Sequence, residues 1–267
     1  STARRSSRFI SAAIARGPMR SSARLRGFRR SVARRAYRIR EAIPPACYYY
    51  RTVPPVESGL DVLVRRRPAL LRGQRVALLT HQASIDSRYE HAVGLVRELR
   101  GAKVTRLLAP EHGLWGAPQD HIWIDGTRDP ATGLPVWSLY GARREPTPAM
   151  LRGIDTVVVD LQDVGSRYYT FVWTMALAMR ACARSGVRVV VLDRPNPLGG
   201  TVIEGNVADP VFASFVGLYP LAIRHGMTIG ELAGYLNEQH ALGCRLTVVP
   251  MRGWRRAMLW EDTGLPW

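Results

Sequence analysis

Residues 156–193 read TVVVDLQDVGSRYYTFVWTMALAMRACARSGVRVVVLD. Two short runs rich in β-branched residues, 156–161 and 188–193, enclose a longer segment whose apolar residues have helical spacing. This spacing predicts a helix over 170–185, which Gly186 closes. A strand, a helix and a second strand in this order are typical of a βαβ unit with parallel strands. The stretch therefore predicts an α/β protein.

The same alternation continues on both sides of this unit, from residue 58 onward. Further strands are predicted at 75–80 (RVALLT), 104–108 (VTRLL) and 246–249 (LTVV), and further helices at 89–100 and 228–240. The last helix opens with Thr228 and, three residues later, Glu231, which is the pattern of a capping box. We therefore predict a largely parallel sheet with helices on both faces.

Length and composition limit the class of protein. The chain has 267 residues, of which 46% are hydrophobic, enough for a buried core. No apolar run reaches the roughly 18 residues that a membrane-spanning helix needs. The three cysteines, Cys47, Cys182 and Cys244, are an odd number without CxxC spacing. Neither a disulfide framework nor a zinc knuckle is predicted.

The positive charge is concentrated at the N-terminus. Lys and Arg total 38 against 21 Asp and Glu, a net charge of +17, and residues 1–57 carry +12 of it. Apolar residues between 25 and 43 have helical spacing, so this segment is predicted to be a basic amphipathic helix or a disordered tail. It suits an anionic surface, a targeting peptide or a nucleic-acid arm. Because residues 58–267 are only mildly basic, nucleic acid is not the partner that we predict for the body.

Proline pairs mark a linker ahead of the body. Pro44-Pro45 and Pro54-Pro55 bracket three consecutive tyrosines. We place the domain boundary near residue 57, with a basic N-terminal extension over 1–57 and the catalytic domain over 58–267.

Polar clusters follow the four clearest strands. They are 80–82 (THQ), 111–113 (EHG), 160–163 (DLQD) and 193–197 (DRPNP). Ligands of open α/β sheets bind at the carboxyl ends of the strands. These clusters are therefore expected together at the edge of the sheet where those ends lie, which we call the rim. Ordinary turn and cap residues would explain any one cluster alone.

Several chemistries lack their motifs. No GxGxxG follows the first strand, and no GxxxxGK[ST], GxSxG, HxH or HExxH occurs. The sequence therefore predicts neither a nucleotide cofactor nor a metal, and it disfavours a serine hydrolase.

The carboxylates of the rim suit glycoside hydrolysis, in which one acid protonates the leaving oxygen and a second carboxylate acts as base or nucleophile. Glu111 is the best-placed acid, and Trp115 and Trp123 after it offer faces on which a sugar can stack. The candidates for the second carboxylate are Asp163, Asp193 and Glu204. Asp163 also suits a helix cap, and Asp193 an ion pair with Arg194 or Arg167.

Four long motifs give the chain a family resemblance. They are 110–116 (PEHGLWG), 161–170 (LQDVGSRYYT), 192–198 (LDRPNPL) and 224–231 (RHGMTIGE). In this order they resemble the NamZ family of bacterial exo-β-N-acetylmuramidases, long classed as a domain of unknown function. The resemblance implies a Rossmann-like domain without nucleotide, joined to a smaller C-terminal domain, with the active site in the cleft between them.

The resemblance also implies a substrate and its binding residues. The substrate is the non-reducing-end N-acetylmuramic acid (MurNAc) of peptidoglycan fragments, released without a cofactor. Glu111 and Asp163 are the predicted catalytic residues, and Arg167 or Arg194 is expected to hold the lactyl carboxylate bidentately. The predicted substrate-binding residues are His112, Gln162, Arg167, Tyr169, Asp193, Arg194, Asn196, Glu204 and His225.

The chain departs from the family pattern in two places. Position 81 is His where the family usually has Asn, so a hydrogen bond of the rim is expected to differ. The chain stops at Trp267, where family members continue, so most of the smaller domain is expected to be absent and the chain to be a fragment or a degenerate gene product.

A cell-wall substrate implies a periplasmic or extracellular protein. Residues 1–57 contain no uninterrupted apolar core of the kind that a secretory signal has. The expected location therefore rests on the family resemblance alone.

Overall fold

The computed structural model of the chain describes residues 55–116, 127–141 and 143–266. The predictions for the basic segment up to residue 54, for Cys47 and for Trp123 lie outside the described residues. Within these ranges, no helix is long and apolar enough to cross a membrane.

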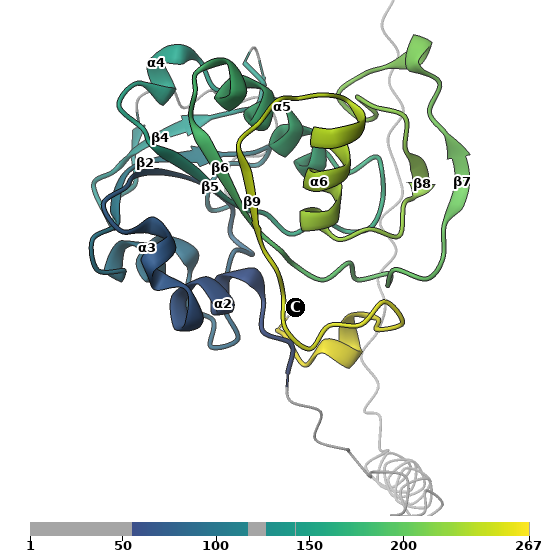
Figure 1. Ribbon diagram of the computed structural model, residues 1–267, viewed down its shortest axis with the longest axis horizontal. Helices are drawn as coiled ribbons and strands as arrows, with labels where there is room; N and C mark the ends of the chain where they lie inside the picture. The colour runs from purple at the N-terminus through teal and green to yellow at the C-terminus, as the bar shows by residue number, and fades with distance from the viewer. Residues whose placement is uncertain (1–54, 117–126, 142, 267) are drawn as a thin grey trace, which may run out of the picture. The chain divides into compact units, whose positions relative to one another are not determined.

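The core of the fold is a seven-stranded sheet with the order β3-β4-β2-β1-β5-β6-β9 (Figure 1). All neighbouring strands are parallel except the edge pair β3 and β4. The strands are β1 (Arg75–Thr80), β2 (Lys103–Ala109), β3 (Thr127–Arg128), β4 (Pro135–Ser138), β5 (Thr156–Asp160), β6 (Arg188–Leu192) and β9 (Leu246–Val249). Without β3, the six parallel strands have the chain order 3-2-1-4-5-6 of Rossmann folds. The predicted fold class is confirmed.

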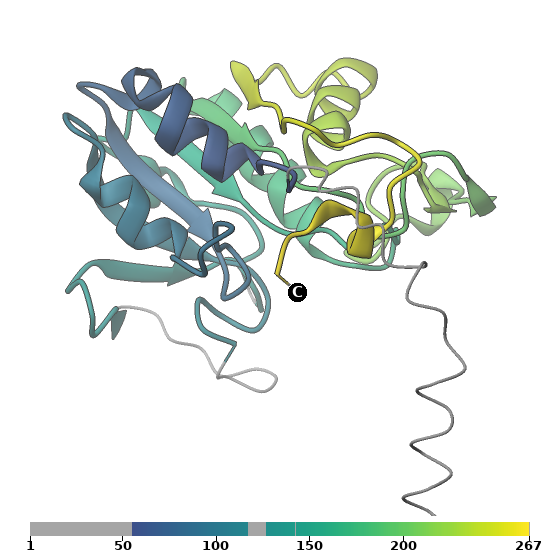
Figure 2. The ribbon, with the colours of Figure 1, turned by 90° about the horizontal axis from the view of Figure 1, so that it is seen from below.

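Helices cover both faces of the sheet (Figures 1 and 2). The α-helices are α2 (Gly59–Arg66), α3 (Ala92–Glu98), α4 (Pro148–Leu151), α5 (Phe171–Arg184) and α6 (Ile229–Gln239), and the 3-10 helices are η2 (Pro68–Leu71), η3 (Pro210–Phe212) and η4 (Trp260–Thr263). One buried cluster lies under α4, α5 and α6, and the other under α2, η2 and α3.

Strand β1 shows how the sequence fills both clusters. Ala77 and Leu79 face the first cluster, whereas Val76 and Leu78 face the second. Alternate side chains of a strand point to opposite faces, so a parallel sheet that is covered on both sides needs continuous apolar runs. The runs RVALLT, TVVVDL and RVVVLD meet this need.

The predicted helices over 170–185 and 228–240 are confirmed. Helix α5 begins after Thr170, and the chain turns at Gly186 with a φ of 66°. Helix α6 begins after Thr228, whose hydroxyl accepts a hydrogen bond from the Glu231 amide. The Glu231 carboxylate accepts one from the Thr228 amide in return, so the predicted capping box is present.

The predicted helix over 89–100 was too long, because α3 starts only at Ala92. The carboxylate of Asp86 accepts hydrogen bonds from the amides of Arg88 and Glu90 and so folds the preceding residues into a tight loop. Tyr89 in this loop has a φ of 65°, which is incompatible with a right-handed helix.

Helix α2 was missed, although its start has a sequence signal. Ser58 and Asp61 form a capping box, with the Ser58 hydroxyl 2.7 Å from the Asp61 carboxylate. Just ahead of it, the Val56 amide donates to the Thr263 carbonyl at 2.8 Å. The residues next to the predicted domain boundary therefore pack against the C-terminal segment.

A two-stranded antiparallel sheet, β7 (Glu204–Val207) with β8 (Ala222–Arg224), lies beside the main sheet (Figure 1) and was not predicted either. Its surroundings expose apolar side chains, of which Phe212 is 78% and Val211 76% accessible. Both strands are short and have few alternating apolar residues, so the sequence pattern did not predict them.

A substitution at Gly59 tests the close contact between α2 and the backbone of the sheet. A Cβ atom at Gly59 would lie 2.3 Å from the amide nitrogen of Asp193 and 2.7 Å from the carbonyl oxygen of Val249. Both are backbone atoms of the sheet, so Gly59→Ala must displace the helix. We expect it to lower the free energy of unfolding by about 2 kcal/mol or more.

The matched control is Gly94→Ala in α3, where nothing lies within 4 Å of the added Cβ. Because Ala favours a helix over Gly, this variant should be neutral or more stable by up to about 1 kcal/mol. Urea unfolding of both variants checks the expectation, and equal stabilities would contradict the described contact.

Candidate active site

The site lies where the strand order reverses, between β1 and β5. Ligands of doubly wound sheets bind at this switch point, outside the carboxyl ends of the strands. The His81 ring nitrogen Nε2 accepts a hydrogen bond from the Gln162 amide at 3.1 Å, and the Ser84 hydroxyl donates to the Asp160 carbonyl at 2.5 Å. Two of the predicted polar clusters are therefore joined directly.

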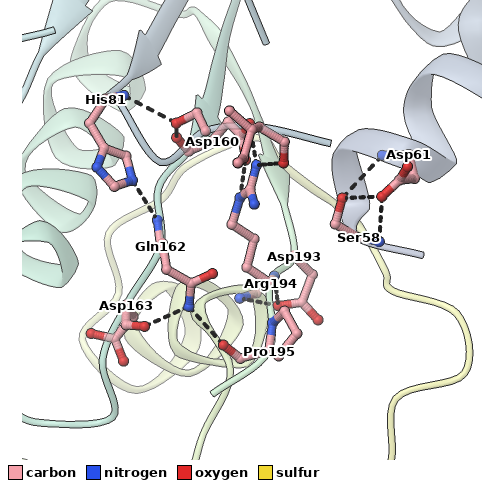
Figure 3. A network of polar contacts seen from close by, with 12 residues as sticks. Ser58, Asp61, His81, Asp160, Gln162, Asp163, Asp193, Arg194 and Pro195 are labelled. Carbon is pink, nitrogen blue, oxygen red and sulfur yellow. Dashed lines mark hydrogen bonds and ion pairs between the residues drawn. The ribbon is translucent and has the colours of Figure 1, made fainter. Parts of the chain in front are cut away.

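A buried ion pair joins the ends of β5 and β6 (Figure 3). Arg194 donates from Nε to Asp160 Oδ1 at 2.6 Å and from Nη2 to Oδ2 at 2.9 Å. Nη2 also donates to the Ile85 carbonyl at 3.1 Å, which fixes the loop after β1. The two side chains are 4% and 0% exposed. The alternative that Arg194 pairs with Asp193 is wrong, because Asp160 takes its place.

His81 is buried and neutral. Burial, followed by the nearby charge of Arg194 and by His91, lowers the pKa of His81 to about 3. Since Nε2 accepts a hydrogen bond, the proton of the neutral ring is on Nδ1. Nδ1 has no partner among the described residues, and the ring packs edge-on against Phe171 at 4.8 Å.

The amide group of Gln162 is held in one orientation. Its Nε2 donates to the Asp163 carbonyl at 2.6 Å and to the Pro195 carbonyl at 2.8 Å. Its Oε1 is buried and has no partner in the part of the chain that the structure describes. The side chain therefore presents a fixed, unused acceptor (Figure 3).

Asp163 is oriented through one of its two oxygens. Oδ2 accepts from the Gly165 amide at 2.8 Å and lies 3.2 Å from Nε2 of His225. His225 Nδ1 accepts from the Met227 amide at 3.2 Å, so the ring proton is on Nε2, which makes no hydrogen bond within the described residues. Oδ1 of Asp163 has no partner within the described residues. The helix-cap alternative is wrong, because the N-cap of α5 is Thr170.

Glu111 follows β2 in a tight turn. The Gly113 amide bonds to the Pro110 carbonyl at 3.1 Å, and His112 between them has a φ of 68°, in the left-handed region. Oε2 of Glu111 accepts a hydrogen bond from the hydroxyl of Thr170 at 2.7 Å. Thr170 belongs to the second motif but was not predicted to be a site residue. His112 itself is exposed.

Tyr169 connects the two candidate catalytic carboxylates. Burial, followed by the charges of Asp163 and Glu111, raises the pKa of Tyr169 to about 12. Both carboxylates therefore act on one hydroxyl, which stays protonated at neutral pH. Tyr169 is thus near both carboxylates, whose catalytic roles stay predictions.

Two of the other predicted binding residues make structural contacts on the β7–β8 side. Arg167 donates from Nη1 to the carbonyls of Asn206 at 2.7 Å and Leu221 at 2.6 Å, so it ties this small sheet to the rim. Glu204 is exposed on β7 and pairs with Arg224 at 2.8 Å. The substrate-binding roles of Arg167 and Glu204 stay predictions.

Asp193 and Asn196 hold neighbouring backbone segments. Asp193 Oδ1 accepts from the Gly230 amide at 2.8 Å, which seats the start of α6, and burial raises the pKa of Asp193 to about 6. Asn196 Nδ2 donates to the Met227 carbonyl at 2.9 Å. Each of these contacts brings residues 227–230 close to the end of β6. The binding roles of Asp193 and Asn196 stay predictions.

A pocket of about 210 Å³ opens at this rim. It is lined by His81, Gln82, Ala83, Ile85, Gln162, Val164, Tyr169, Arg194, Trp260, Leu265 and Pro266. The last three come from the C-terminal segment, which carries no motif and was missed. Within the described ranges, no group of three or more His, Cys, Asp or Glu side chains is arranged to hold a metal ion.

Trp115 has a defined orientation near this rim. Its Nε1 donates to Asp129 at 3.0 Å, its ring lies 4.7 Å from that of His91, and it is 45% exposed. One face of the indole is therefore accessible, as sugar stacking requires. The sequence analysis gave no role to the buried Asp129.

Fold and site together define a Rossmann-like α/β domain whose switch point carries carboxylates in place of a glycine-rich phosphate loop. The model of the family "Exo-beta-N-acetylmuramidase NamZ, N-terminal" matches residues 76–267. The chain belongs to this family.

Similar proteins support the assignment. Peptidoglycan beta-N-acetylmuramidase NamZ of Bacillus subtilis (strain 168) is 45% identical over 213 residues, which are 80% of this chain and 51% of that protein. Two crystal structures of DUF1343 family proteins from Bacteroides fragilis NCTC 9343 are also similar. One is 40% identical with a TM-score of 0.75, and the other is 31% identical with a TM-score of 0.66. They match 80% and 77% of this chain and 54% of their own chains. The chain thus spans about half the length of these relatives.

His81 gives a test of the buried site by its effect on stability. Its pKa is about 3 in the folded protein and 6.5 in the unfolded chain, so the unfolded chain binds more protons between these values. Stability is therefore lost as the pH falls from 6.5 toward 3, by about 1.4 kcal/mol per pH unit. Asp193 has the opposite effect. Its pKa is raised to about 6 in the folded protein, so the folded protein binds more protons than the unfolded chain between about pH 4 and 6, and stability is lost as the pH rises through this range.

The difference between the wild type and His81→Asn isolates the histidine. Asn keeps an acceptor but does not titrate, so the variant should lose less stability than the wild type between pH 6 and pH 4, by about 2–3 kcal/mol. Urea unfolding across this range measures the difference. Parallel stability curves would show that His81 is not buried as described.

Proposed function

We propose that this chain carries the catalytic carboxylates of an exo-β-N-acetylmuramidase, which releases MurNAc from the non-reducing end of peptidoglycan-derived saccharides. The observation that carries the proposal is that two carboxylates are held at the rim, Glu111 by the Thr170 hydroxyl and Asp163 by the Gly165 amide, and that both act on the neighbouring Tyr169. The name of the B. subtilis relative supports the substrate class.

The geometry suggests a role for each carboxylate. Thr170 holds Oε2 of Glu111, which fixes the carboxyl group that would donate a proton to the leaving oxygen as the glycosidic C–O bond breaks. The Gly165 amide holds Oδ2 of Asp163, His225 Nε2 lies 3.2 Å from the same oxygen, and Oδ1 is left unused. Asp163 is then the second carboxylate. The hydroxyl group of a water molecule bonds to the anomeric carbon, and the remaining proton of that water replaces the one that Glu111 gave to the leaving oxygen.

A sugar-binding role without turnover is the second candidate. It is favoured by one observation, that the rim pocket combines polar groups with an apolar wall, which suits a bound saccharide whether or not it is cleaved. A site that binds saccharides and does not hydrolyse them would have the same residues. Activity separates the two candidates.

The test is release of chromophore from a chromogenic β-MurNAc glycoside by the full chain. Glu111→Gln removes the acid and keeps the shape of the side chain, so the rate should fall by about 10²–10⁴-fold. The matched control is Glu98→Gln at the exposed end of α3, which should retain the rate of the wild type. Circular dichroism confirms that both variants fold.

An unchanged rate in Glu111→Gln would overturn the assignment of the acid. A folded wild-type chain that binds MurNAc without releasing chromophore would favour the second candidate.

We also propose that the protein acts in the periplasm or outside the cell, because its proposed substrate derives from the wall. Fractionation of cells that produce the protein, with detection by antibody, tests this location. Detection in the cytosolic fraction alone would overturn it.

A further inference from the structure

The rim pocket has a polar side and an apolar side. His81, Gln82, Gln162, Tyr169 and Arg194 contribute polar groups. Most of the remaining wall is apolar and comes from Ala83, Ile85, Val164, Trp260, Leu265 and Pro266. Such a wall accepts an alkyl group, and the polar groups decide what that alkyl group is attached to.

Arg194 offers a hydrogen-bond donor to the pocket, and its positive charge is balanced by a neighbouring carboxylate. Asp160 binds its Nε and Nη2, so the positive charge is balanced within the protein. Nη1 has no partner in 55–116, 127–141 and 143–266, although the residue is only 4% exposed. A neutral acceptor on a ligand can bond to Nη1 without adding charge. A carboxylate would place a second anion beside the Asp160–Arg194 pair.

Gln162 contributes an acceptor. Its side-chain nitrogen is committed to two carbonyls, so the amide cannot be turned round to present a donor. Figure 3 shows the side-chain oxygen on the side of Gln162 that faces Arg194. A buried acceptor without a partner costs about 1–3 kcal/mol, and a ligand N–H removes this cost.

We propose that this pocket binds the acetamido group at C2 of the sugar. The acetamido carbonyl oxygen accepts from Arg194 Nη1, its N–H donates to Gln162 Oε1, and its methyl group packs on the apolar wall. A secondary amide with a methyl group matches the Arg194 donor, the Gln162 acceptor and the alkyl wall together. The proposal rests on the proposed function for the identity of the sugar.

The position of the pocket agrees with this assignment. Tyr169 lines the pocket and is also acted on by the charges of Glu111 and Asp163. C2 is bonded to the anomeric carbon, so its substituent has to lie beside the catalytic carboxylates. The lactyl group is on C3, one carbon further away. Arg194 is thereby assigned to the acetamido group and not to the lactyl carboxylate.

Binding of three sugars to the full chain tests the proposal. GlcNAc and glucose differ only in the acetamido group, and MurNAc adds the lactyl group to GlcNAc. NMR titration should show GlcNAc binding about tenfold or more tightly than glucose. Equal affinities for GlcNAc and glucose, or no binding of any of the three sugars, would overturn the proposal.

A variant that fills the pocket gives an independent readout. Val164 is partly exposed on the pocket wall, so Val164→Phe blocks the space without disturbing the core. It should weaken the binding of GlcNAc and of MurNAc about tenfold or more. Val211→Phe, the same change at a 76% exposed position outside the pocket, is the matched control and should bind like the wild type. Unchanged binding by Val164→Phe would overturn the proposal.

Hydrolysis of the chromogenic glycoside separates this proposal from the proposed function. Acetamido-dependent binding by a chain that hydrolyses nothing supports the pocket and counts against the muramidase activity. Hydrolysis by a chain that binds GlcNAc and glucose alike supports the activity and overturns the pocket assignment.

Discussion

The buried ion pair between Asp160 and Arg194 is the interaction on which the rim depends. It joins the carboxyl ends of two neighbouring strands and, through the Ile85 carbonyl, the loop after β1. Moving two charges out of water is costly, and a buried pair is tolerated only when its geometry is good and its remaining hydrogen bonds are made. The bidentate contact meets this condition. It also leaves the two N–H groups of Arg194 Nη1 for a ligand, so the group that holds the rim together is part of its binding surface.

The rim is built around polar atoms that the fold leaves without partners. Asp163 Oδ1 and Gln162 Oε1 are buried acceptors, and His81 Nδ1 is a buried donor. In each case the other polar atom of the same side chain is fixed by the backbone, so the side chain cannot rotate to satisfy the free atom. Buried polar atoms without partners lower stability, and they persist where a ligand completes them. This arrangement holds a site in its binding geometry before the ligand arrives.

The sequence predicts the sheet well because a parallel sheet covered on both faces requires continuous apolar runs. It also predicts which loops meet, since carboxyl ends of parallel strands share one edge. It does not predict contacts that form only through tertiary packing. Nothing in the sequence indicates that Arg194 pairs with Asp160 and not with the adjacent Asp193, or that Arg167 binds carbonyls of the β7–β8 sheet. Likewise the C-terminal segment with Trp260 reaches the pocket without a motif that marks it.

A crystal structure of the Glu111→Gln variant with MurNAc tests the central claim most directly, that this rim holds the sugar for cleavage. The account predicts density for MurNAc at the switch point, with the anomeric carbon facing positions 111 and 163 and the acetamido group between Arg194 and Gln162. A sugar bound elsewhere on the domain, or seated at the rim with its anomeric carbon turned away from both carboxylates, would contradict it.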